Sequence, residues 1–206
     1  NNFITEYQRR VVDKSLPQWL RPYQDAGIER FVSLGLPGPK DEAWKYTSMK
    51  ELTGHDYIVA NNPSQSGALS KEELQYVDRF NQRLVFIKGS YSEEHSNIGA
   101  AGIEVKFFKD VKDSTVIKES LIAYPSENAF ASLNKAFLHQ AVWLDVKADV
   151  SIKDPIHVIH VNGGKHEALN PRLVVTAGKH SKVNVLQSYV SFNDDDYFTN
   201  AVTDIY

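Results

Sequence analysis

Residues 35–47 read GLPGPKDEAWKYT, a mixture of glycine, proline, charge and aromatic rings that neither a regular helix nor a regular strand requires. Gly35 is typical of a helix end, and the two prolines fix backbone angles, so we expect a helix to stop there and a rigid connector to follow. Trp44 and Tyr46 then fall in a short new turn, where their apolar rings favour burial while the NH and OH groups need partners.

The stretch before Gly35 has helical periodicity. Two apolar stripes precede it, Phe3, Tyr7, Val11 and Val12 in the first and Ile28, Phe31, Val32 and Leu34 in the second. Pro22 suits the first turn of the second helix. The chain from its start to about position 50 is therefore predicted to be helical.

Further helices are expected after a polar connector at residues 61–70. Ser70 followed three positions later by Glu73 has the form of a capping box, which predicts a helix start. Apolar spacing predicts two more helices over residues 116–124 and 126–139.

Strand-like runs dominate the second half of the chain. Residues 84–87 and 103–108 are short strand candidates, and later runs begin near Val142, Ile156, Arg172, Lys182 and Tyr197. Regular short strands indicate a sandwich, a barrel or a β-solenoid. The recurrence of Gly-Lys-His at positions 164–166 and 178–180 favours the solenoid.

The final stretch, YFTNAVTDIY at 197–206, forms a β-rich run that ends inside what looks like a strand. An exposed strand edge of this kind pairs readily with another chain. We therefore expect the chain to be the N-terminal part of a longer protein, and expect this segment to self-associate more readily than the longer protein.

Composition narrows the function. A chain of 206 residues with 42% hydrophobic residues can bury a core, and its net charge of −3 argues against a dedicated nucleic-acid binder. No apolar run approaches the ~20 residues that cross a bilayer, and no secretory signal is visible, so a cytoplasmic location without membrane partners is expected. The chain has no cysteine, which excludes disulfides, thiolate nucleophiles and metal sites ligated only by cysteine.

Four histidines are the first candidates for chemistry. His157 and His160 lie three apart in a strand and face opposite sides, so we expect one packed inside and one exposed rather than a shared metal. His166 and His180 would stack as a metal or proton site if the interval between the two Gly-Lys-His triplets were one coil. Each follows a lysine, which disfavours a metal ion, and we expect both to be solvated turn residues.

Acidic and aromatic candidates remain. The carboxylates from Asp194 to Asp196 could bind a hard cation such as calcium or magnesium, or could form the acidic site of a pectin-lyase-like enzyme. The favoured interpretation is a solvated loop. For Trp44 and Tyr46 the alternatives are a docking surface and aromatic anchors that pin the connector to the helices, and we favour the anchors. With no phosphate-binding glycine loop and no nucleophile motif, the sequence predicts no catalytic, cofactor-binding or metal-ligating residue.

Four stretches resemble one known family: GLPGPKDEAWKYT at 35–47, NAFASLNKAF at 128–137, PRLVV at 171–175 with Gly178 behind it, and YFTNAVTDI at 197–205. They are similar to the SufB/SufD family of iron–sulfur cluster assembly scaffolds, although Asp204 stands where that family has Glu. The Trp-Lys-Tyr triplet points to the SufD branch.

The resemblance implies an α+β, mainly β architecture, with an N-terminal helix-rich domain over residues 1–140 and the first, incomplete rungs of a right-handed parallel β-helix over residues 141–206. It implies a non-enzymatic scaffold subunit of a SufBCD complex that assembles clusters and transfers them to acceptor proteins. The partners would be a SufB-like subunit and a SufC-like ATPase. No cofactor is expected in this segment, and any cluster would be held at the level of the complex. The alternative is a carbohydrate-active β-helix enzyme.

Overall fold

The computed structural model describes residues 2–11, 16–60, 68–122 and 128–206. The α-helices are α1 (Asn2–Val11), α2 (Arg21–Leu34), α3 (Lys50–Gly54), α4 (Lys71–Val77), α5 (Thr115–Ile122) and α6 (Ala129–Ala136). Short 3₁₀ turns are η1 (Gln18–Leu20), η2 (Glu42–Trp44), η4 (Phe108–Asp110) and η5 (Leu138–Gln140). Among the described helices, none combines the length and the apolar composition needed to cross a membrane.

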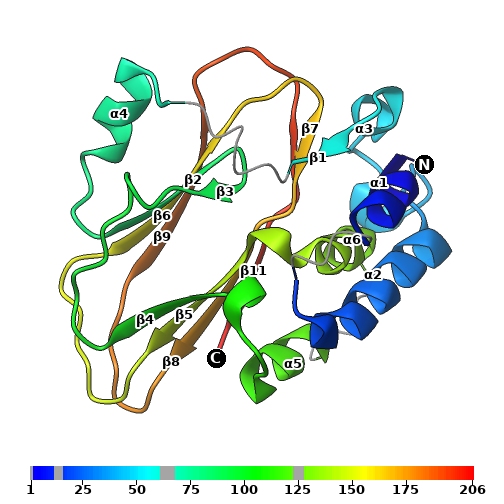
Figure 1. Ribbon diagram of the computed structural model, residues 1–206. Helices are drawn as coiled ribbons and strands as arrows, with labels where there is room; N and C mark the ends of the chain where they lie inside the picture. The colour runs from blue at the N-terminus through cyan, green and yellow to red at the C-terminus, as the bar shows by residue number, and fades with distance from the viewer. Residues whose placement is uncertain (1, 12–15, 61–67, 123–127) are drawn as a thin grey trace.

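The strands form three sheets that lie beside the helical layer (Figure 1). They are β1 (Ile58–Val59), β2 (Arg83–Ile87), β3 (Ser90–Tyr91), β4 (Ile103–Phe107), β5 (Ala141–Val146), β6 (Ile156–Asn162), β7 (Glu167–Leu169), β8 (Arg172–Ala177), β9 (Val185–Ser191), β10 (Phe198–Thr199) and β11 (Val202–Ile205). The sheet orders are β1-β7-β10, β11-β8-β5-β4 and β3-β2-β6-β9. Helices and sheets together make an α+β fold, as the sequence predicts at that level.

Parallel pairing in the second half follows a regular order. β5 pairs with β8, β6 with β9 and β7 with β10, so the chain visits the three sheets in turn and then returns to each of them in the same order. One such circuit spans about twice the interval between the two Gly-Lys-His triplets, as the register of Ala141 with Arg172 shows. One coil for each triplet interval, the condition under which His166 and His180 would stack, is therefore not met, because the two triplets lie in different turns between sheets.

Strands from the first half extend all three sheets. β2 runs parallel to β6, β1 runs parallel to β7, and β4 pairs antiparallel with β5. α4 covers the outer face of the β2–β6 sheet, where Val77 packs against a cluster that includes Val85 and Ile159. As a result, β2 and β6 are buried on both faces.

The helices α1, α2 and α6 pack together on the opposite side of the molecule (Figure 1). Gly27 of α2 faces the backbone of α6 so closely that an added Cβ would lie 2.8 Å from the amide nitrogen of Ala136. Phe3 of α1 meets Phe31 of α2 edge to face, with ring centroids 6.0 Å apart. The helical layer is therefore a packed unit, as the apolar stripes predict.

Local signals in the sequence are largely confirmed. Gly35 ends α2 with φ +68°, and Ser70 and Glu73 form the expected capping box of α4. The run at 197–206, expected as one strand, is instead β10 and β11 in two different sheets. The run near Lys182 makes only an isolated bridge, with Ser151, before β9 begins. Val12 and residues 61–67 of the polar connector lie outside the described residues.

Candidate functional site

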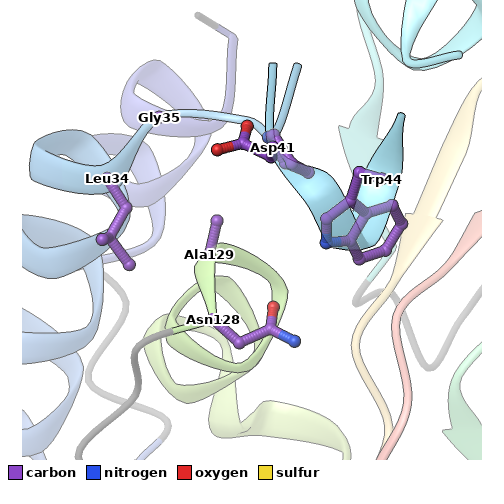
Figure 2. Close-up of a pocket in the computed structure, with 7 residues that line it drawn as sticks. Leu34, Gly35, Asp41, Trp44, Asn128 and Ala129 are labelled. Atoms are coloured by element: carbon purple, nitrogen blue, oxygen red, sulfur yellow. The ribbon is translucent and has the colours of Figure 1, made fainter. Parts of the chain in front are cut away.

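The connector after α2 closes over the helical layer and leaves a pocket of about 340 Å³ (Figure 2). Its lining consists of Leu34, Gly35, Pro37, Asp41, Trp44, Asn128 and Ala129. The positive φ of Gly35 turns the chain out of α2, and the prolines keep the connector extended. Figure 2 shows Asp41 and Trp44 from the connector above Asn128 and Ala129 at the start of α6.

Short-range hydrogen bonds hold both sides of this pocket. The Asp41 carboxylate accepts from the Gly38 amide at 2.6 Å, and the Asn128 side chain caps α6 by accepting from the Phe130 amide at 2.8 Å. The Trp44 ring packs on Phe130 with centroids 5.1 Å apart. Trp44 is thus an anchor, as predicted.

Tyr46 is not an anchor, because 91% of its surface is exposed. η2 ends at Trp44, and Tyr46 lies in the turn that follows it, where the Lys45 ammonium sits over its ring. Of the lining residues, Asp41 alone is ionisable, so the pocket lacks the paired groups of an acid–base site.

A buried polar junction joins the helices to the strands. Arg172, the first residue of β8, makes an ion pair of 2.6 Å with Asp204 of β11, and their side chains are 5% and 2% exposed. The Arg172 guanidinium also donates to the Asn134 side chain of α6 and to the Ser120 carbonyl of α5, both at 3.3 Å. One side chain of β8 therefore reaches two helices and a second strand.

Asparagines complete this junction. The Asn134 amide donates to the carbonyls of Pro171 and Asn200 at 3.0 and 2.8 Å. The Asn200 amide donates to Asn170 and to the Phe130 carbonyl, both at 2.9 Å. The residues of the junction come mostly from the stretches at 128–137, 171–175 and 197–205 that the sequence singled out, and the fold brings the three together.

Burial governs the ionisation of this junction. Burial lowers the pKa of Arg172, although the nearby Asp204 carboxylate opposes the shift. Burial likewise raises the pKa of Asp204, against the opposing pull of Arg172. The pKa of Lys135, one residue after Asn134, falls through burial and through repulsion by Arg172. This pattern is that of a structural ion pair closed off from solvent.

The two histidines of β6 face opposite sides, as expected, but both are buried at 3% exposure. His160 stacks between Phe86 and Tyr189 in neighbouring strands, with centroids 5.0 and 4.8 Å away. His157 lies 2.7 Å from the Ser188 hydroxyl and edge-on to Phe80. The expectation of one exposed histidine is wrong because α4 and the segment after it cover the outer face of this sheet.

The other candidates predicted from the sequence lie in different environments. His180 is exposed and lies 3.2 Å from Asp149, which confirms a solvated turn. His166 is half-buried and stacks on His55 with centroids 4.4 Å apart, so it is neither a solvated residue nor a neighbour of His180. Asp194 to Asp196 are exposed, as expected of a loop. Sequence reasoning missed His55, because no local motif connects two positions so far apart in the chain.

Comparison with known proteins matches residues 2–158 to the family model described as the SufBD protein N-terminal region. An iron–sulfur cluster assembly SufBD family protein of Synechocystis is 28% identical over 189 residues, covering 84% of this chain and 42% of that protein. The iron–sulfur cluster assembly protein SufD of Escherichia coli is 26% identical over 188 residues, covering 87% of this chain and 41% of that protein.

The SufD protein of Bacillus subtilis is 20% identical over 225 aligned residues, covering 97% of this chain and 48% of that protein. The chain therefore spans less than half the length of each of these three relatives. The family resemblance inferred from the four quoted stretches is confirmed.

Proposed function

This chain belongs to the SufBD family, and we propose that it supplies the N-terminal region of a scaffold subunit in iron–sulfur cluster assembly. The observation that carries the proposal is the family match over residues 2–158, supported by relatives whose names assign them to cluster assembly. The contribution of the segment would be structural, since three of its four family-like stretches meet in a buried junction rather than in an open cleft. We propose no catalytic residue for it.

The partners we propose are a SufB-like subunit and a SufC-like ATPase, acting together in the cytoplasm. This chain lacks cysteine, so a cluster would be ligated largely by other chains or other regions, and would be passed to acceptor proteins from the assembled complex.

We also propose that the paired strands are the first turns of a right-handed parallel β-helix. The parallel pairs β5–β8, β6–β9 and β7–β10 support this, because each circuit of the chain returns to the same three faces in the same order. On this proposal residues 1–140 are the helix-rich domain and residues 141–206 begin the β-helix, with β1, β2 and β4 added to its faces.

The test is co-purification of the full protein with SufB-like and SufC-like proteins from the same source. We expect the full protein to retain both partners in a stoichiometric complex. A matched sample of residues 1–206 shows whether this segment contributes a binding surface of its own. Failure of the full protein to retain either partner would overturn the scaffold proposal.

The carbohydrate-active alternative gains no support. Such chemistry needs two carboxylates facing each other across an open site. Within the described residues, the carboxylates of the 194–196 run stand on one exposed loop, where Asp195 accepts a hydrogen bond from the neighbouring Asn193.

A further inference from the structure

Two histidines and one carboxylate converge beside β1, β7 and β10. One potential ligand atom from each of His55, His166 and Asp196 lies within 4.8 Å of the others. The two imidazole rings stack at 4.4 Å with 25° between their planes. Among the described residues, no side-chain hydrogen bond engages these ring nitrogens or this carboxylate, so their lone pairs are not committed to another partner.

Backbone register creates this convergence. Ile58 pairs with Glu167, and Ala168 pairs with Phe198, so the residues just before β1, β7 and β10 stand side by side. The Ile58 amide donates to the His166 carbonyl at 2.9 Å, and the His166 amide donates to the Asp196 carbonyl at 2.6 Å. Three chain segments are thereby fixed relative to one another before any ligand binds.

The backbone at His166 is itself unusual. His166 has φ +58°, a left-handed conformation that a residue other than glycine rarely adopts. In this conformation its ring lies against His55 instead of extending into solvent. The buried Tyr57 supports both rings, with its own centroid 6.2 Å from each.

The surroundings favour a cation. The negative charges of Asp196 and Glu51 both act on Tyr57, whose ring lies against the two imidazoles. The nearest lysine in sequence, Lys165, is exposed and can direct its ammonium group into solvent. The negative charges of two carboxylates thus act on the cluster of His55, His166 and Asp196, and they offset the repulsion of a cation by the neighbouring Lys165.

We propose that His55, His166 and Asp196 form a binding site for a divalent transition-metal ion of the zinc class. Two imidazoles and a carboxylate are ligands that zinc accepts, and three protein ligands leave a fourth position for water or a further donor. Ligand atoms on one zinc ion stand ~3.4 Å apart in tetrahedral geometry, so small rotations of the exposed carboxylate and of the rings bring this set into place. The inference does not rest on the scaffold function.

The test is a titration of the full protein, free of metal and of any polyhistidine tag, with Zn²⁺ alone and then with Co²⁺, whose visible absorption reports coordination. Two variants probe the site, His166→Asn, because asparagine tolerates the left-handed backbone, and Asp196→Asn, which keeps the backbone contacts. We expect each variant to bind one equivalent less than the parent protein, or to bind that equivalent more than tenfold weaker, and to lose the Co²⁺ spectrum of that site.

His180→Asn is the matched control, because it removes a histidine from the same Gly-Lys-His sequence with nearly the same backbone angle, φ +61°. It should bind both ions as the parent protein does. Equal binding by the parent protein and Asp196→Asn would overturn the inference, and so would an equal loss in His180→Asn, which would show diffuse surface binding. Circular dichroism without metal tests whether each variant is folded. If His166→Asn does not fold, Asp196→Asn alone tests the proposed metal site.

Discussion

Two carboxylates in strands of one sheet pair with cations, yet their ionisation is shifted in opposite directions. Asp204 pairs with Arg172 at the buried junction, where burial raises its pKa. Asp145 lies 2.9 Å from Lys106 and 2.7 Å from Lys147 near the sheet edge. Burial also acts on Asp145, but hydrogen bonds from Lys147, Lys106 and Thr176 outweigh it and lower its pKa to about 2.

The difference between the two pairs shows that solvent access decides how much an ion pair contributes to the stability of the fold. At the edge, the Lys106 side chain is 31% exposed, and water and several donors stabilise the charge of Asp145. At the junction, both charges are removed from water, and their attraction must first offset that desolvation. We infer that the junction specifies how α5 and α6 dock on β8 and β11, while the Asp145 cluster adds ordinary electrostatic stability.

The largest effect is expected from Asp204→Asn. The substitution keeps the shape but leaves the Arg172 guanidinium without a counter-charge in a site only 5% exposed. Breaking a buried pair in this way costs about 3–5 kcal/mol. Urea unfolding monitored by circular dichroism measures the loss.

A double variant, Arg172→Met with Asp204→Leu, separates the cost of a lone charge from the worth of the pair. It should be less destabilised than Asp204→Asn, because no unpaired charge remains. A loss for Asp204→Asn below about 1 kcal/mol would remove the contrast between junction and edge.

The next effect concerns acid and uses the buried His160. Burial lowers its pKa to about 3 from the ordinary 6.5, so the unfolded chain takes up a proton that the folded protein excludes. The neutral His160 makes its full contribution to the free energy of unfolding above pH 6.5, and this contribution is lost as the pH falls toward 3. At pH 4 the loss is about 3 kcal/mol.

His160→Phe, which preserves a flat ring between Phe86 and Tyr189, should remove this dependence. Unfolding free energies of both proteins are to be compared at pH 7 and pH 4. The gap between them should shift by about 3 kcal/mol in favour of the variant at the lower pH. Parallel pH curves would show that burial of His160 does not govern acid stability.

A smaller effect is expected from Asp145→Asn in β5, beside the edge strand β4. The Asp145 side chain is 18% exposed, and its lowered pKa means that the folded protein favours the ionised form. That preference contributes about 2 kcal/mol above pH 4, and the contribution is lost as the pH falls through about 2. Urea unfolding should therefore show the variant to be less stable than the parent protein at pH 7 and nearly as stable as the parent protein at pH 2. A difference that persists at pH 2 would point to lost packing instead.

Local chemistry made much of this fold predictable. Two examples are the capping box of Ser70 and Glu73 and the helix end at Gly35. Each involves residues within one helical turn of each other, so the sequence alone predicts it. Apolar periodicity likewise indicated the helical layer and the β2 strand. These features need no knowledge of which strands pair.

Register is the part that could not be read from the sequence. The Gly-Lys-His repeat could not show which residue each histidine meets. His166 meets His55 and His180 meets Asp149, because the chain crosses all three sheets before it returns to the first. The junction of Arg172 with Asp204 depends on the same long-range pairing. The quoted family stretches were identified correctly, but the common place of three of them in one buried network appears only in three dimensions.

The smallest effect is expected from Asp113→Asn, which completes the range from buried to exposed. Asp113 lies 2.6 Å from Lys118, the same separation as in the Arg172–Asp204 pair, but 67% and 37% of these two side chains are exposed. Water screens the attraction, so the hydrogen bond from Lys118 lowers the pKa of Asp113 without adding appreciably to the free energy of unfolding. Urea unfolding of the variant should match that of the parent protein in both low and high salt. A clear loss at low salt that disappears in high salt would show that an exposed pair contributes here, and that distance rather than burial ranks the ion pairs of this protein.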